Sequence, residues 1–366
     1  MSIVATFFKY FPPPRFLAMP HTGVDISPTA IRFIELEQTP KGLEVVSFGE
    51  QLLPKELVSG IPLNSNPDLI TALKKIQKEY NLSFVEVSIP EDKAYVFTTE
   101  IPFGDHESIK NHIEFHLEEN VPLALSDAVY DYFIIRRNEK TGTFFASVSV
   151  IPVGVTEDYI DLFSKCGMTV VSFLIENQAL TRAVIEKGDK RTTLIVSVRH
   201  QKSVLSVISE EAVQFTSTIP IGSQDFTTAI MKEFNVGEAD ARRLKKEKGF
   251  VRSKDNEAIF MSLINTASTL KDEINRIYTY WESYRDKNKG DVIIAPISRI
   301  VLSGRDASLA GFREYIGLSM RTDVELANVW ANVVSFNDAI PPIEYSDSLN
   351  FGTAIGLALP KQKDIK

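Results

Sequence analysis

Residues 23–36 read Gly23-Val-Asp-Ile-Ser-Pro-Thr-Ala-Ile-Arg-Phe-Ile-Glu-Leu36. Apolar residues flank a short Ser-Pro-Thr turn, and this pattern predicts a strand, a tight turn and a second strand. Residues 43–49 predict a third strand directly after them. The stretch therefore predicts a β-meander near the start of the chain.

The same pattern returns in the second half of the sequence. Residues 194–208 read Leu194-Ile-Val-Ser-Val-Arg-His-Gln-Lys-Ser-Val-Leu-Ser-Val-Ile208, and a strand pattern over 212–219 follows. Asp25 of the first copy aligns with Ser197 of the second, and Ile31 aligns with Ser203. Helical patterns follow each meander, so the sequence predicts a duplicated α/β unit in two domains.

Composition narrows the class of protein. The chain has 366 residues, of which 44% are hydrophobic and 24% charged, as in globular proteins with more than one core. Lys and Arg number 40 against 48 Asp and Glu, and this negative balance argues against wholesale nucleic-acid binding. Cys166 is the single cysteine, which excludes a disulfide framework and favours a core position. Without a secretion signal or a long apolar run, we expect a cytoplasmic protein.

The first turn is a candidate phosphate site. Asp25 ends a strand, Ser27 and Thr29 lie in the turn, and Arg32 follows within reach of a phosphate. An acidic residue beside small hydroxyl residues is typical of loops that hold nucleotide phosphates and a metal ion. The alternative is an ordinary hairpin, because an Asp before a turn is also common there.

Three other groups of residues are candidates for a binding site. A strand runs into Ser303-Gly-Arg305, where a helix N-terminus could bind a phosphate, or where a plain turn could be capped by Asp306 or Ser308. His112, His116 and Glu119 share a helix face, for which a solvated surface is favoured over a zinc site. The basic run from Arg242 to Lys248 contains interleaved acids and is typical of a solvated helix.

Several short motifs follow one another along nearly the whole chain after the first 20 residues. They are residues 23–36 and Ile101-Pro, Ile113-Glu-Phe-His-Leu-Glu-Glu-Asn-Val-Pro122, Asp131-Tyr-Phe, Glu176-Asn-Gln-Ala-Leu-Thr-Arg-Ala183, Ile219-Pro-Ile-Gly222, Ala241-Arg-Arg-Leu-Lys245, Glu273-Ile-Asn-Arg276, Leu302-Ser-Gly and Ala354-Ile-Gly-Leu-Ala-Leu359. In these motifs and their order the chain resembles the PilM family of type IV pilus assembly proteins.

The resemblance implies an actin-like α/β fold, in which two duplicated RNase-H-like subdomains face a nucleotide cleft and a small α+β subdomain is inserted in the first. The expected boundaries are an aromatic, Pro-rich tail (1–20), subdomain 1A (21–93 and 154–190), inserted subdomain 1C (94–153), subdomain 2A (191–224 and 298–345), subdomain 2B (225–297), and a C-terminal helix with a polar tail (346–366).

By the same resemblance, particular residues of this chain would form the nucleotide site. They are Asp25, Ser27, Thr29, Arg32, Ser203, Lys245, Gly304 and Arg305, with Asp25 on the Mg²⁺ side and Glu176 as the candidate that orders water. The sequence departs from the family pattern here, because Ser197 replaces a carboxylate, Ser27 and Arg305 replace glycines, and Arg242 replaces a ribose-contacting Glu.

These departures remove parts that phosphoryl transfer needs. The reaction depends on positioning and on charge compensation around a metal, and a side chain on a phosphate-cradling residue pushes the backbone donors away. We therefore expect ATP hydrolysis to be lost and ATP/Mg²⁺ binding to be weakened, although Arg199 and Lys202 could still attract an anion.

The resemblance also implies partners and a location. It predicts a cytoplasmic adaptor, peripheral to the inner membrane, that binds the N-terminal peptide of a PilN-like protein between subdomains 1A and 1C. PilO-like and motor ATPase components would be reached indirectly, and the aromatic tail is a candidate for membrane-surface contact. The alternatives are an active ATP-binding protein of the FtsA type and a phosphotransferase of the same superfamily.

Overall fold

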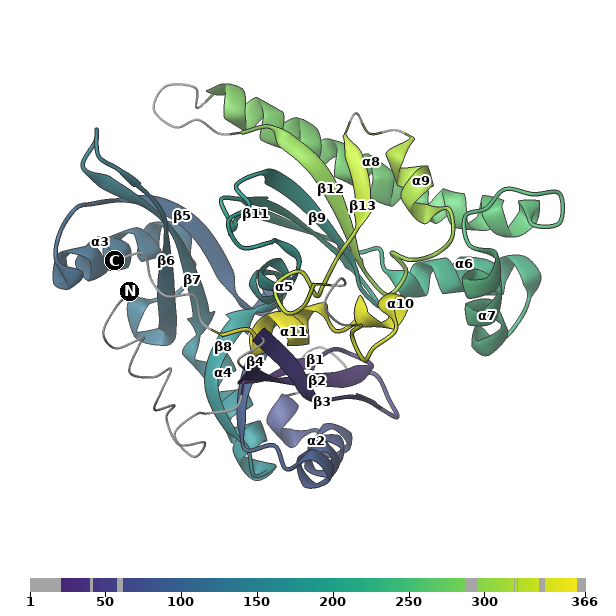
Figure 1. The fold of residues 1–366 in the computed structure, drawn as a ribbon, viewed down its shortest axis with the longest axis horizontal. Coiled ribbons are helices and arrows are strands. Elements are labelled where there is room, and N and C mark those ends of the chain that lie inside the picture. The colour runs from purple at the N-terminus through teal and green to yellow at the C-terminus, as the bar shows by residue number, and fades with distance from the viewer. Residues whose placement is uncertain are drawn as a thin grey trace.

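A computed structural model describes residues 21–39, 42–57, 62–287, 295–318, 320, 322–335 and 340–360. The proposed aromatic tail and the polar tail after residue 360 lie outside these residues. Two sheets form the centres of two halves of the molecule, and a third, smaller sheet lies at one end (Figure 1). Of the helices that the structure describes, none combines the length and apolar character needed to span a bilayer.

The sheet of the first half has the strand order β3-β2-β1-β4-β8. β1, β2 and β3 pair antiparallel, whereas β4 and β8 join in parallel. The meander predicted from residues 23–49 is thus confirmed, with β3 longer than expected. The strands are β1 (His21–Ile26), β2 (Ala30–Thr39), β3 (Gly42–Leu52), β4 (Phe84–Ile89) and β8 (Thr169–Ile175).

The sheet of the second half repeats this arrangement with the order β11-β10-β9-β12-β13. Again three strands form an antiparallel meander and two join in parallel. The duplication predicted from the sequence is therefore confirmed at the level of topology. The strands are β9 (Thr192–Val198), β10 (Ser203–Ser209), β11 (Ala212–Ile219), β12 (Ile297–Gly304) and β13 (Asp323–Leu326).

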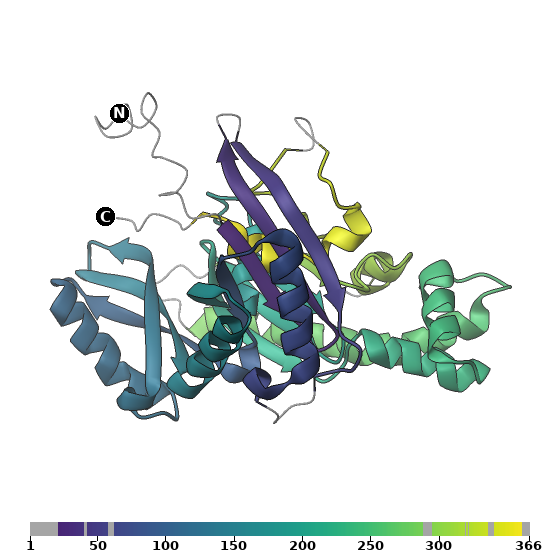
Figure 2. The ribbon, with the colours of Figure 1, turned by 90° about the horizontal axis from the view of Figure 1, so that it is seen from below.

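The inserted unit has its own small core. Its antiparallel sheet has the order β5-β7-β6, built from β5 (Tyr95–Pro102), β6 (Ala128–Asn138) and β7 (Thr143–Pro152). Helix α3 (His106–Asn120) buries Ile109, Ile113 and Leu117 against this sheet. Figure 2 shows the unit at one end of the molecule, with the helices of the second half at the other.

Amphipathic helices cover both large sheets. α2 (Pro67–Tyr80) and α4 (Val153–Lys165) share the core of the first sheet. In the second half, α6 (Ser223–Phe234), α7 (Glu238–Lys248) and α8 (Glu257–Lys287) pack together (Figure 1). The sequence of α8 has apolar residues every three or four positions, and this stripe is buried, since Leu263, Leu270 and Ile274 have no exposed surface.

Helices α5 (Glu176–Val184) and α11 (Gly352–Ala358) connect the two halves. α5 follows the first sheet but packs on β10 and β11 of the second, whereas α11 ends the second half and packs on β1, β2 and β4 of the first. The helices also pack on each other so closely that a Cβ on Gly356 would lie 1.7 Å from the Ala179 carbonyl oxygen. The small residues seen in the sequence permit this crossing.

The sequence reading differs from the structure at the end of the chain. The strand β13 was not predicted, because its four residues give a short pattern. The helix expected from Ser308 begins at Phe312 as α9 (Phe312–Gly317), and its N-cap is Gly311 rather than Asp306 or Ser308. The helix expected over residues 346–359 is divided into α10 (Tyr345–Ser348) and α11.

Candidate functional site

The turn between β1 and β2 uses its own backbone donors. The Ser27 N–H donates to the Ala30 carbonyl over 2.9 Å, and the Ala30 N–H donates back to Ser27 Oγ over 3.2 Å. Pro28 has no N–H. Of the four turn residues, only Thr29 has a backbone donor outside this internal pattern, so the turn offers little to a phosphate.

Asp25 and Arg32 lie side by side in this hairpin, in register on paired strands. Asp25 is buried, and its Oδ1 accepts a 2.7 Å hydrogen bond from Ser88. Arg32 is also buried and forms a 2.6 Å ion pair with Glu50. The charge predicted to bind a phosphate is therefore compensated within the first half.

The corresponding turn of the second half lies between β9 and β10. Ser197, which aligns with Asp25, is buried and accepts a 3.4 Å contact from Arg199 Nε. Ser203 donates from its hydroxyl to the Ile221 carbonyl over 2.6 Å. At the position that aligns with Asp25 the second half thus has a serine, and the hydroxyl of Ser203 is used to join β10 to the segment before α6.

Glu176, the candidate for ordering water, is hydrogen-bonded to Arg199. Glu176 is the first residue of α5 and its side chain is 9% exposed; its carboxylate accepts a hydrogen bond from Arg199 Nη1. The same guanidinium donates to both carboxylate oxygens of Glu91, over 3.0 and 3.1 Å. A carboxylate held by a guanidinium is a poor proton acceptor, so this geometry does not favour a catalytic Glu176.

Lys245 has become part of a buried polar network. Its Nζ donates to Asp306 over 2.7 Å, to the Ser223 carbonyl and hydroxyl, both over 2.9 Å, and to Thr227 Oγ1 over 3.0 Å. Burial lowers the pKa of the Lys245 ammonium, and the negative charge of Asp306 opposes that effect. These contacts fix α7 to α6 and to the segment after β12.

Gly304 and Arg305 form the turn after β12. Gly304 has a φ of +93°, and a Cβ there would lie 2.2 Å from the Val198 carbonyl oxygen, so the position needs glycine. Arg305 keeps contact with solvent, yet the protein around it and the neighbouring charge of Arg32 both lower the pKa of its guanidinium. The negative charges of Glu50 and Asp306 act on the Arg305 pKa in the opposite direction, so this cation lies among carboxylates of the protein itself.

The remaining predicted residues fit a Mg²⁺-nucleotide poorly. Magnesium binding in such sites depends on carboxylates that hold the ion and its waters, whereas Asp25 already accepts a hydrogen bond from Ser88 and pairs in register with Arg32. Within the described ranges, no three His, Cys, Asp or Glu side chains come together as a metal site. Asp25, Ser27 and Arg32 are brought together as predicted, while Lys245 and Glu176 are each bound to other protein groups.

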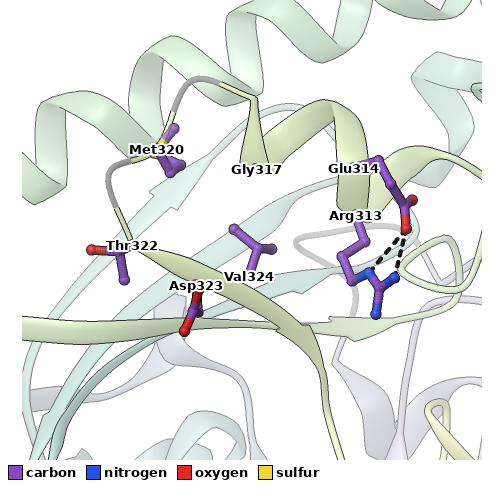
Figure 3. Close-up of a pocket in the computed structure, with 7 residues that line it drawn as sticks. All are labelled: Arg313, Glu314, Gly317, Met320, Thr322, Asp323 and Val324. Atoms are coloured by element: carbon purple, nitrogen blue, oxygen red, sulfur yellow. Dashed lines mark hydrogen bonds and ion pairs between the residues drawn. The ribbon is translucent and has the colours of Figure 1, made fainter.

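Other candidates raised by the sequence have local partners. His112 contacts the Glu100 carbonyl at 2.8 Å and His116 contacts Glu119 at 3.0 Å. Cys166 is buried, as expected, and burial raises the pKa of its thiol. A pocket of about 450 Å³ between α9 and β13 contains none of the predicted site residues (Figure 3). It is lined by Arg313, Glu314, Gly317, Met320, Thr322, Asp323 and Val324.

The sequence analysis did not predict the acidic residues that contact the turn between β9 and β10. Glu91 and Asp92 follow β4, and Glu56 follows β3, and all three contact residues 199–202. The local signal was the Pro90-Glu-Asp-Lys93 run at the end of a buried strand. Nothing in that run indicates a cationic turn more than 100 residues away, so only the fold could have paired them.

Comparisons with known proteins agree with this architecture. A family model described as type IV pilus assembly protein PilM matches residues 23–362. A solved structure described as the PilM-PilN type IV pilus biogenesis complex has a TM-score of 0.71 at 16% identity, over 92% of this chain and 97% of that chain.

Two further solved structures have the same fold. Ethanolamine utilization protein EutJ from Carboxydothermus hydrogenoformans matches with a TM-score of 0.55 at 12% identity, over 95% of this chain and 90% of that one. MreB5 of Spiroplasma citri bound to ADP matches with a TM-score of 0.51 at 13% identity, over 86% and 94%. The duplicated sheets and these similarities establish an actin-like fold. With the family model extending over most of its length, the chain belongs to the PilM family of type IV pilus assembly proteins.

Proposed function

We propose that this chain is an adaptor in type IV pilus assembly whose activity is to bind the N-terminal cytoplasmic peptide of a PilN-like protein. The supporting observation is the family match over residues 23–362. A structure of similar fold is described as a PilM-PilN complex, which makes a PilN-like peptide the natural first ligand to test. The chain would then act through an interface rather than through chemistry.

The peptide would bind beside the inserted unit, between residues 94–153 and the rest of the first half. Among the strands that the structure describes, β6 ends the small sheet and β8 ends the sheet of the first half, so each has one edge without a partner strand in its sheet. Val129 on β6 is 48% exposed and Val171 on β8 is 42% exposed. An extended peptide can add to such an edge through main-chain hydrogen bonds and cover apolar side chains there.

A binding titration tests this proposal. We expect a fluorescent peptide with the N-terminal sequence of the PilN-like partner to bind the full chain, and a scrambled peptide of the same composition to fail. Val129→Glu or Val171→Glu should weaken binding by about tenfold, since a charge in a desolvated contact costs more than about 1.4 kcal/mol.

The control is Val46→Glu on β3. Val46 is 54% exposed, so it matches the two test positions in residue type and exposure but lies on the opposite edge of the sheet. It should leave the affinity unchanged. Absence of binding by the folded chain contradicts the peptide proposal, and equal weakening by all three variants contradicts the proposed position.

We propose further that ATP hydrolysis is lost and that ATP/Mg²⁺ binding is weak or absent. Three observations support this. Ser197 stands where a carboxylate would be needed on the metal side, and the Ser27 turn uses its own backbone donors. Glu176 and Lys245 are bound to Arg199 and Asp306 of the protein itself. Phosphoryl transfer depends on positioned charge around the metal, and these residues leave little of it.

Calorimetric titration with ATP and Mg²⁺, together with a phosphate-release assay, tests the loss of activity. We expect no turnover above background, and either no binding or a dissociation constant above about 0.1 mM, where RT ln Kd is about −5.5 kcal/mol. Micromolar binding with steady phosphate release would instead favour the alternatives, an active ATP-binding protein of the FtsA type or a phosphotransferase.

The location follows from this role. An adaptor for a PilN-like protein would lie on the cytoplasmic side, peripheral to the inner membrane, and would reach PilO-like and motor ATPase components indirectly. Residues 1–20 are rich in Phe and Pro and are the proposed membrane-surface contact. Co-sedimentation with liposomes, compared between the full chain and a chain lacking these residues, tests that contact; equal binding by both contradicts it.

A further inference from the structure

Residues 199–202, the turn between β9 and β10, reach from the second half to the first. Arg199 makes the central contact, donating through two nitrogens to both oxygens of Glu91 and through Nη1 to Glu176. The guanidinium side chain is 19% exposed, and those of Glu91 and Glu176 are 7% and 9% exposed. A cation that is largely withdrawn from water is therefore compensated by two carboxylates of the opposite half.

The other residues of the turn make contacts in the same direction. Lys202 Nζ lies 2.6 Å from Asp92 Oδ1, and Gln201 donates to Glu56 over 2.9 Å. His200 Nε2 contacts the other oxygen of the same Glu56. All four consecutive side chains thus bind acidic groups of the first half, and we name this set of contacts the clasp.

The backbone of the turn is hydrogen-bonded to the N-terminus of α6. The carbonyl groups of Arg199 and His200 accept hydrogen bonds from the Ser223 and Gln224 N–H groups over 2.7 and 2.9 Å. These donors belong to the first turn of α6. The backbone of residues 199–202 therefore satisfies a helix N-terminus that would otherwise attract an anion. A Cβ on Gly222 would lie 2.5 Å from the His200 carbonyl oxygen, which shows how closely the turn rests on α6.

We infer that the clasp joins the two halves in place of a bound nucleotide, so that the unliganded molecule is already closed. Two cations of the second half that could meet an anionic ligand, Arg199 and Lys202, are committed to Glu91, Glu176 and Asp92. An anion entering the junction would have to compete with carboxylates that are covalently part of the chain. This inference rests on the proposed loss of nucleotide function and does not depend on the peptide partner.

Spin labels on the two halves test the clasp directly. Val46→Cys on β3 and Lys246→Cys on α7 provide exposed label sites, and Cys166 is too buried to compete. Without nucleotide, the wild-type background should give one narrow distribution of label distances. Arg199→Ala should broaden that distribution about twofold or move it to longer distances, because the second half then loses the guanidinium that binds Glu91 and Glu176 of the first half.

Matched variants separate opening from a general loss of structure. Arg243→Ala removes an arginine of the same half whose 2.9 Å ion pair with Asp240 stays within α7, and it should leave the distribution unchanged. Lys202→Ala removes a more exposed contact and should broaden the distribution less than Arg199→Ala, which keeps the test valid should Arg199→Ala fail to fold. Circular dichroism and the unfolding temperature report on folding in each case.

The result separates this inference from the proposed function. Identical narrow distributions for the wild type, Arg199→Ala and Lys202→Ala overturn the clasp, and so does a broad wild-type distribution that narrows only when ATP and Mg²⁺ are added. Peptide binding is measured on the same samples. Its absence in a wild-type chain with a narrow distribution contradicts the peptide proposal while leaving the clasp supported.

Discussion

At the scale of single residues, several side chains predicted to contact a nucleotide instead bond to other groups of the protein. Lys245 illustrates the change, since its ammonium group donates to Ser223, Thr227 and Asp306, all in the second half. A buried ammonium is tolerated only when its charge and its protons are all satisfied. The residue that the motif pattern assigned to a ligand therefore stabilises the fold.

Lys245→Met should reduce the free energy of unfolding by about 3–5 kcal/mol, the range for removing one partner of a buried ion pair. The physical reason is that Asp306, which is 3% exposed, is left as an uncompensated buried charge. Denaturant unfolding measures the loss. Combining Lys245→Met with Asp306→Asn should recover part of it, because the second change removes that charge.

The neighbouring Lys246 provides the control for this prediction. Lys246 is exposed on the same helix, and Lys246→Met should change the free energy of unfolding by less than about 0.5 kcal/mol. Equal effects at both positions would contradict a structural role for Lys245.

The sequence predicted correctly that some of the candidate residues lie together and missed other contacts, for a physical reason. Asp25, Ser27 and Arg32 lie within one hairpin, and strand pairing alone brings them together. Arg199 and Glu91 are 108 residues apart, and their pairing depends on how the two halves meet. Local sequence patterns predict contacts between residues that are close in the chain. They therefore cannot predict that a turn in one half contacts an acidic run in the other.

At the scale of elements, strands with strong patterns were predicted almost to the residue, as with β11, which was expected over residues 212–219 and is found over Ala212–Ile219. The end of the chain was harder to predict because tertiary contacts decide it. Gly311 has a φ of +77° and starts α9 after a turn that packs on Phe250. Asp306 and Ser308 are good N-cap residues and favoured an earlier start in the sequence, but this packing places the start at Gly311.

The crossing of α5 and α11 yields a prediction about close packing. Gly356→Ala should destabilise the protein by about 1–3 kcal/mol or more, because the new Cβ would lie 1.7 Å from the Ala179 carbonyl oxygen, which is backbone and cannot rotate away. The gain in helix propensity, about 1 kcal/mol, offsets only part of this cost. Thermal unfolding measures the net effect.

Gly154→Ala in α4 is the matched control. Nothing lies within 4 Å of a Cβ added there, so the same substitution should be neutral or slightly stabilising. A neutral Gly356→Ala would mean that α5 and α11 do not approach as closely as described.

At the scale of the whole molecule, two kinds of contact join the halves. One is apolar, since a single core contains Ile34 and Leu36 of the first sheet, Ala183 of α5 and Leu205 of the second sheet. The other is the clasp, which is polar and therefore depends on ionisation. The apolar contact does not titrate, so pH can be used to isolate the clasp.

Asp92 provides the last prediction. Partial burial raises the pKa of its carboxyl, but the hydrogen bond and charge of Lys202 outweigh that effect and hold it below its ordinary value of 3.8. Because the folded-state pKa lies below the unfolded one, the Asp92–Lys202 contact stabilises the protein fully above about pH 4 and loses its contribution as pH falls through the folded-state pKa. Asp92→Asn should lower the free energy of unfolding by at most about 1 kcal/mol, the range for exposed ion pairs.

Urea unfolding of the wild type and Asp92→Asn from pH 7 to pH 3.5 measures this difference at each pH. The gap between the two proteins should stay constant down to about pH 4 and close only below it. Its size should also shrink at 1 M salt, since the Asp92 side chain is 57% exposed and its charge is screened. A gap that closes between pH 7 and pH 5 would show that another group governs the contact, and the description of Asp92 as the lowered carboxylate of the clasp would then be wrong.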